Sequence, residues 1–215
     1  MDITLEQFYE SIAQFNQMIY PAQWAVMLLA FTAVLFIMVK KSFSNALIIG
    51  VAILFYLMCA LAFWLPMGFR GYENGFLYMA IFILEAGFLL SAAVENELDF
   101  EFKPTPYAII GLIFVAYGLI GYPLAGLALG HTYPELIFSP LLPCPLNTWW
   151  VGMLLMTTKP VPRYTLIIPF IWGLVGIMWV GLGVTDYIAG LIICLSAPAL
   201  LVIRDRGKYH HLHYP

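Results

Sequence analysis

Seven apolar runs, separated by charged or turn-forming residues, are the feature that most limits what this chain can fold into. They lie at about 22–39, 46–65, 76–94, 107–129, 146–158, 164–181 and 187–203. A helix that crosses the hydrocarbon core of a bilayer needs about 20 predominantly apolar residues, and most of the runs approach that length. The pattern predicts an all-α integral membrane bundle of seven transmembrane helices.

The composition of the 215-residue chain agrees with this class. Hydrophobic residues make up 63% of it and charged residues 10%, with a mean hydropathy of +0.91. Soluble domains carry about 45–50% apolar and about 25% charged residues. Sixty-three per cent of 215 is about 135 residues, close to the roughly 140 that seven spans of about 20 would need. A soluble enzyme, a disordered chain and a disulfide-rich secreted domain are therefore excluded. No linker interrupts the runs, so we expect one transmembrane domain over residues 1–215.

Basic residues are distributed unevenly between the two sides that seven spans would create. With the N-terminus outside, only Arg70 falls on the outer side, and the other eight of the nine basic residues face the cytoplasm. These eight are Lys40, Lys41, Lys103, Lys159, Arg163, Arg204, Arg206 and Lys208. The positive-inside rule therefore predicts an outer N-terminus and a cytoplasmic tail at 204–215, in the inner (plasma) membrane. The outer side is acidic, with Asp2, Glu6, Glu10, Glu73, Glu135 and Asp186.

The first 20 residues are amphipathic rather than uniformly apolar. Apolar side chains recur at helical spacing, at Leu5, Phe8, Tyr9, Ile12, Phe15 and Ile19. Thr4 and Gln7 have the spacing of a capping box, and Tyr20-Pro21 ends the segment. The segment is too polar to span, and it lacks the lysines and arginines that would attract it to anionic lipid. We expect an amphipathic helix that lies either in the membrane interface or on the outer surface of the protein itself.

Glu85 is the only acidic residue inside one of the seven runs, about ten residues into the third. A charged side chain at mid-membrane costs on the order of 2.5–3.5 kcal/mol, so such residues are rare. One interpretation is a protonatable relay or a cation ligand. The other is a protonated carboxylic acid that hydrogen-bonds to a neighbouring helix and holds the bundle together.

The stretch from Gly130 to Trp150 is apolar but broken by four prolines, at 134, 140, 143 and 145. Prolines at this density exclude a regular helix. Irregular backbone at membrane depth is tolerated where protein buries it or where it lines a cavity. We expect a half-buried segment that leads into a short helix capped by Asn147 or Thr148. It forms either a binding site, as broken helices do in several transporter folds, or a structural plug.

Several other polar residues are expected near the outer half of the bundle. They are Gln23, His131, Tyr133 and Cys144. His131 and Cys144 are possible ligands for a soft metal; the alternatives are a capping histidine and a small packed cysteine. The three cysteines match no disulfide framework or zinc motif, and no cofactor is indicated. The histidines of the tail, His210, His211 and His213, form a short cluster that is either metal-binding or without function.

Four motifs resemble the DUF6064 family of uncharacterised bacterial membrane proteins. They are YPAQ at 20–23, GYPLAGLALGHTYP at 121–134, CPLNTWW at 144–150 and KPVPR at 159–163. The resemblance implies a membrane protein of about this length and points to Pro21, Gln23, His131, Tyr133, Pro134, Cys144 and Pro145 as motif positions. Leu146-Asn147 depart from the Cys-Pro-Thr-Thr pattern of the family. The resemblance implies no activity.

The function that the residues favour is binding or transport of a small solute or ion through an outward-facing cavity. Glu85 would lie at the floor of that cavity, with His131, Tyr133, Asn147 and Gln23 nearer its mouth. The alternative is a receptor, sensor or accessory subunit of a larger membrane assembly; a weaker one is a metal-dependent or lipid-modifying enzyme. Expected partners are the lipid bilayer and a small solute or ion, with an oligomer or partner subunit possible. The net charge of −3 gives no reason to expect nucleic acid.

Overall fold

The structure is a computed structural model that describes residues 3–212, with side chains described as far as residue 206. The side chains of His210 and His211, and all of His213, lie outside that part. The described residues form helices joined by loops, with one isolated bridge between Phe100 and Thr157. Its elements are α1 (Leu5–Ile19), α2 (Ala22–Val39), α3 (Ser44–Met58), η1 (Cys59–Trp64), α4 (Leu65–Phe69), α5 (Asn74–Val94), α6 (Pro106–Ala116), η2 (Tyr117–Gly121), α7 (Tyr122–Ala128), α8 (Pro143–Leu154), η3 (Arg163–Leu166), α9 (Ile167–Gly181), η4 (Thr185–Tyr187) and α10 (Ile188–Leu212).

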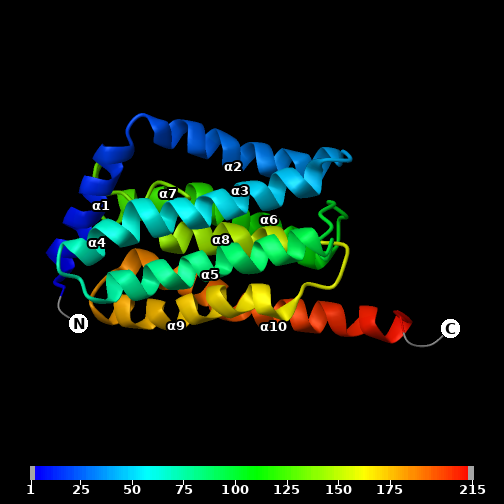
Figure 1. Ribbon diagram of the computed structural model, residues 1–215. Coiled ribbons are helices and arrows are strands. Elements are labelled where there is room, and N and C mark those ends of the chain that lie inside the picture. Colours follow the sequence, from blue (N-terminus) through cyan, green and yellow to red (C-terminus); the bar gives the residue numbers. More distant parts are fainter. Residues whose placement is uncertain (1–2, 213–215) are drawn as a thin grey trace.

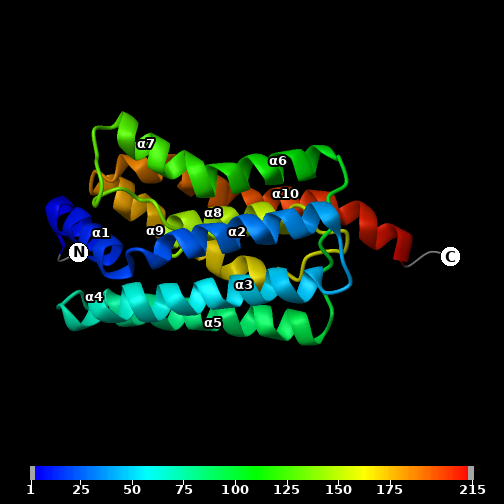
Figure 2. The same cartoon turned by 90° about the horizontal axis from the view of Figure 1, so that it is seen from above.

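Six helical rods in the described chain are long and apolar enough to cross a membrane. They match six of the seven predicted runs and lie side by side in Figures 1 and 2. Their bounds are Ala22–Val39, Ser44–Phe69, Asn74–Val94, Pro106–Ala128, Arg163–Gly181 and Thr185–Arg206. The chain is therefore a multi-pass helical membrane protein.

The fifth predicted run, 146–158, is not among these six rods. It corresponds to α8, whose 12 residues extend only about 18 Å at 1.5 Å per residue, against a hydrocarbon core of about 30 Å. Every residue of α8 is buried, and α8 lies inside the bundle in Figure 2. The apolar composition that suggests a lipid-facing span instead reflects burial against protein on all sides.

The chain nevertheless passes from one end of the bundle to the other between residues 136 and 154. Close contacts show that this stretch runs antiparallel to the rod formed by α6, η2 and α7. Leu136 lies against Gly126, Trp149 against Gly118, and Gly152 against Gly111. This part of the chain thus runs along the bundle as an irregular segment followed by the short helix α8.

Two of the long rods contain a π-helical segment directly before a proline. η1 precedes the Leu65-Pro66 step and η2 precedes the Tyr122-Pro123 step. A proline inside an α-helix lacks an N–H group, and its ring clashes with the carbonyl group four residues earlier. The wider π turn relieves that clash, so each rod continues past its proline. Both π segments face the bundle interior, where η1 contributes Cys59 and η2 contributes Gly118.

α1 lies across one end of the bundle (Figure 1). Its capping box is confirmed, because the Gln7 N–H donates to Thr4 Oγ1 at 3.2 Å and the Thr4 N–H donates to Gln7 Oε1 at 2.8 Å. The apolar face packs on the protein, with the Phe8 ring 4.8 Å from that of Trp179 and 5.6 Å from that of Tyr187. Of the two expected positions for this helix, the structure shows docking on the protein's own surface.

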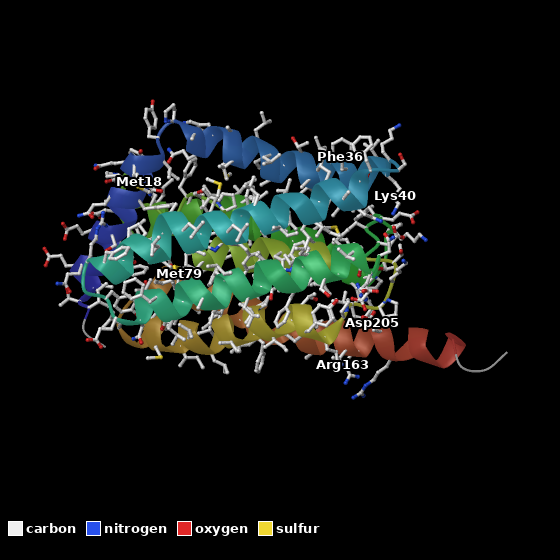
Figure 3. The ribbon with its side chains drawn as sticks, viewed as in Figure 1. Met18, Phe36, Lys40, Met79, Arg163 and Asp205 are labelled. Atoms are coloured by element: carbon white, nitrogen blue, oxygen red, sulfur yellow. The ribbon has the colours of Figure 1, made fainter. Side chains whose placement is uncertain are left out.

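The basic residues gather at the opposite end of the bundle. Figure 3 places Lys40, Arg163 and Asp205 at this end, far from Met18 of α1. Lys40 forms an ion pair with Asp99, whose carboxylate also accepts from Asn45 Nδ2 at 2.8 Å. These contacts join the α2–α3 turn to the loop that follows α5.

Candidate functional site

The first half of α8 is buried inside the bundle and carries three polar side chains, Cys144, Asn147 and Thr148. The helix begins at Pro143 with Leu142 as its N-cap. The prediction that Asn147 or Thr148 caps this helix is therefore wrong. Prolines fit the first turn of a helix because N–H groups there have no partner within the helix. Ser139 accepts hydrogen bonds from the N–H groups of Leu141 and Leu142, at 3.2 and 3.0 Å, and thereby satisfies the buried turn before α8.

Asn147 joins α8 to α3 through a buried hydrogen bond. The Tyr56 hydroxyl donates to Asn147 Oδ1 at 2.9 Å, and Asn147 Nδ2 donates to the Pro143 carbonyl oxygen at 2.8 Å. Both ends of the amide are thus engaged. Sequence reasoning singled out Asn147 but not Tyr56, because a tyrosine in an apolar run does not stand out.

Thr148 makes the equivalent contact on the other side of α8. Its Oγ1 lies 3.4 Å from the Tyr122 hydroxyl of α7. Tyr122 is fully buried and fills the space beside Gly190 of α10, where a Cβ atom would lie 1.6 Å from its hydroxyl oxygen. The glycine at 190 therefore makes room for the tyrosine.

Cys144 is buried between the same helices. Trp172 Nε1 of α9 donates to its Sγ at 3.1 Å, and the hydroxyl groups of Tyr122 and Tyr187 lie close to it. Its thiol is free, as are those of Cys59 and Cys194. Within residues 3–206 no three or more His, Cys, Asp or Glu side chains come together as a metal site. A metal at His131 and Cys144 thus has no third protein ligand of these types there.

Glu85 faces the bundle interior from the middle of α5. It is fully buried, and neither carboxyl oxygen has a hydrogen-bond partner. Phe82, one turn earlier, packs against Tyr56 and Trp172, with ring centroids 5.6 and 5.2 Å away. The Tyr56 side chain also lies close enough to Glu85 to interact with it electrostatically. Glu85 thus lies beside the Tyr56–Asn147 hydrogen bond in an aromatic environment.

His131 belongs to a separate group at the end of the bundle covered by α1. Its ring stacks on Tyr9 with centroids 4.2 Å apart, and its Nε2 lies 3.7 Å from Asp186 Oδ1, an ion pair when the imidazole is protonated. The Tyr9 hydroxyl donates to Asp186 Oδ1 at 2.9 Å. Burial, and then the hydrogen bond to Asp186, raise the pKa of Tyr9 well above its ordinary value.

Tyr133 and Gln23 lie outside the central group. Tyr133 is exposed, and its hydroxyl donates to the Asn16 carbonyl oxygen at 3.4 Å. Asn16 itself is buried and donates through Nδ2 to the carbonyl oxygens of Pro134 and Leu136, both at 2.7 Å. Asn16 thereby joins the proline-broken segment to α1. No local sequence pattern predicts this role. Gln23 is buried in the first turn of α2 with its Oε1 unpaired.

Apart from Gln23, the expected site residues thus fall into two groups. The central group contains Glu85, Asn147 and Cys144, and the end group contains His131 and Tyr133. Clefts of about 200 and 180 Å³ open at the two ends of the bundle. None of the predicted site residues lines either cleft. The central group is enclosed, because Glu85, Asn147 and Cys144 are all buried.

Comparison with known proteins identifies one match. The sequence profile described as "Family of unknown function (DUF6064)" matches residues 5–212. No curated protein and no solved structure matches the chain.

Proposed function

This chain belongs to the DUF6064 family, and from the geometry of its interior we propose that it carries a small ion or solute across the membrane with Glu85 as its proton-binding group. The observation that carries the proposal is the pair of unpartnered carboxyl oxygens in the middle of α5. An ionised carboxylate there would be strongly disfavoured, so the neutral acid is the resting form. A carboxyl group that is protonated only while it is buried releases its proton when water reaches it. Proton release from Glu85 can therefore be coupled to the opening of the bundle.

Polar side chains lie between the covered end of the bundle and Tyr56, the neighbour of Glu85, and they support a route along this path. From Asp186, the route continues through Tyr187 to Cys144, then across Thr148 and Asn147 on α8 to Tyr56. Each of these residues carries a group that donates or accepts a hydrogen bond. The route follows the broken crossing made by residues 136–154, the type of segment that builds binding sites in several transporter folds.

In this proposal the basic end of the bundle faces the cytoplasm of the plasma membrane, as the positive-inside rule favours. The end covered by α1 then faces outward. The enclosed centre corresponds to a state closed to both sides, and access from outside requires movement of α1 or of residues 130–142.

Flux measurements in proteoliposomes test the proposal. With a pH-sensitive dye inside the vesicles, an imposed cation or anion gradient is expected to move protons through the wild-type protein and not through Glu85→Gln. Glu73→Gln, at an exposed acid outside the bundle interior, is the control and should behave like wild type. Background flux in wild type with protons, metal cations and small anions would overturn the proposal, as would unchanged flux in Glu85→Gln.

A second function, an accessory subunit of a larger membrane assembly, is favoured by the enclosed centre and the small mass outside the six long rods. It predicts a stoichiometric partner after purification in mild detergent. Purification of a stable chain without any partner would count against it.

A further inference from the structure

A polar cleft of about 200 Å³ separates α1 from the end of α4. One wall consists of Gln7, Glu10, Ser11 and Gln14 of α1. The other consists of Met67 and the turn from Arg70 to Tyr72. Nothing in the central group contributes to this cleft, so its chemistry is separate from that of Glu85.

The two walls carry opposite charges that are not paired with each other. Glu10 accepts a hydrogen bond from Gln14 Nε2 at 3.1 Å. No salt bridge of Glu10 or Arg70 occurs within the described part of the chain. Arg70 is also the one arginine or lysine that lines this cleft. A ligand with a single charge would be attracted by one wall and repelled by the other, whereas a zwitterion satisfies both.

Tyr72 also lines the cleft, but its hydroxyl is not open to it. The residue is 6% exposed, and the hydroxyl oxygen is buried beside the side chains of Tyr78 and Asn74. The charged contact that this wall offers to a ligand is therefore Arg70.

The cleft is large enough for a small organic ligand. Its volume of about 200 Å³ is well above the roughly 10–15 Å³ that one water molecule needs. An adjoining recess of about 20 Å³, lined by Phe15, Phe63 and Pro66, accepts little more than a methyl group.

We infer that this cleft binds a small free α-amino acid. The carboxylate lies against Arg70, the ammonium group against Glu10, and the side chain against the apolar recess. The amide NH₂ group of Gln7, whose Oε1 is engaged by the Thr4 N–H, is a further donor to the carboxylate. Recognition needs both charged groups of the ligand, so neither the amine nor the acid alone is sufficient.

Calorimetric titration of the full chain in detergent tests this inference. L-alanine is expected to give saturable binding, L-leucine weaker binding, and ethylamine and propionate none. Arg70→Gln and Glu10→Gln are each expected to weaken L-alanine binding roughly tenfold or more, since a charge-assisted hydrogen bond is lost. Glu6→Gln, one turn earlier on α1 and outside the cleft, is the matched control and should bind as wild type does.

The inference is overturned if L-alanine shows no saturable binding at millimolar concentration, if propionate or ethylamine binds equally well, or if Glu10→Gln binds like Glu6→Gln. Glu85→Gln should bind L-alanine like wild type. L-alanine binding therefore tests the cleft independently of the transport proposal.

Discussion

The Tyr9 hydroxyl donates a 2.9 Å hydrogen bond to Asp186 Oδ1, which joins the first helix to a residue 177 positions later in the chain. This bond lies at the centre of the interface between α1 and the end of the bundle. His131 stacks on the same tyrosine and lies 3.7 Å from the same carboxylate oxygen. The position of α1 therefore depends on a buried polar group as well as on the packing of Phe8 and Ile12.

Tyr9→Phe is expected to loosen α1 and to lower the free energy of unfolding by about 1–3 kcal/mol, because Asp186 loses a donor while it stays buried. Thermal unfolding in detergent measures the loss, and limited proteolysis within residues 3–19 measures the exposure of α1. Tyr20→Phe is the control because the Tyr20 side chain is largely exposed. Equal protease resistance of Tyr9→Phe and Tyr20→Phe would contradict this role.

Structural features that depend on residues close together in the sequence were predictable from it. The capping box of Thr4 and Gln7 depends on residues three positions apart and forms as expected. Six of the runs form rods long enough to span, because span length and apolarity are local properties. The burial of α8 was not predictable, since an apolar run has the same composition whether lipid or protein surrounds it.

The candidate site was predictable only in part, for a similar reason. Glu85 is conspicuous as an acid in an apolar run, and Asn147 follows a proline-rich break. Their neighbours Tyr56, Tyr122 and Thr148 carry neutral polar groups that are common in membrane helices. Asp186 was expected among the acidic residues of the outer side, and the structure shows that it is buried. Its partners come from α1 and from the loop at His131, and no local pattern links these segments.

Acid is expected to destabilise the opposite end of the bundle through Asp99. Burial alone would raise the pKa of this carboxyl, but hydrogen bonds from Lys40, Thr158 and Asn45 lower it from 3.8 to about 2. The stabilisation is therefore complete above the unfolded-state pKa and is lost as pH falls through the folded-state pKa. The amount at stake is on the order of 2 kcal/mol.

Thermal midpoints between pH 5 and pH 2 measure this effect. Asp99→Asn should be less stable than wild type near neutral pH and should lose less stability across the acid range. Glu95→Gln, at an exposed position in the same loop, should retain the wild-type acid dependence. An acid dependence of Asp99→Asn identical to that of wild type would show that other groups carry it.

Close packing of α8 against α6 makes Gly111→Ala strongly destabilising. A Cβ atom at Gly111 would lie 2.6 Å from the Gly152 carbonyl oxygen, which is backbone and cannot move aside without shifting a helix. We expect a loss of about 1–3 kcal/mol from this overpacking. Gly87→Ala provides the comparison, because nothing lies within 4 Å of its added Cβ. That substitution should be neutral or stabilising by roughly 0.5–1 kcal/mol, since alanine favours the helix. Similar thermal midpoints for the two variants would contradict the close contact.

Glu85→Met distinguishes a functional carboxyl group from a structural one. If Glu85 held the bundle together by a hydrogen bond, its removal would destabilise the protein. Its oxygens are instead unpartnered among apolar and aromatic side chains. Replacement by a flexible apolar side chain of similar size should therefore raise the free energy of unfolding by about 1–3 kcal/mol. The same variant should lose proton-coupled flux. Residues required for function are often unfavourable for stability, so replacing them stabilises the protein and removes its activity. Thermal unfolding in detergent and flux in proteoliposomes are measured on the same preparation, with Glu73→Met as the exposed control. A destabilised Glu85→Met would favour the structural role and remove the main support for proton coupling.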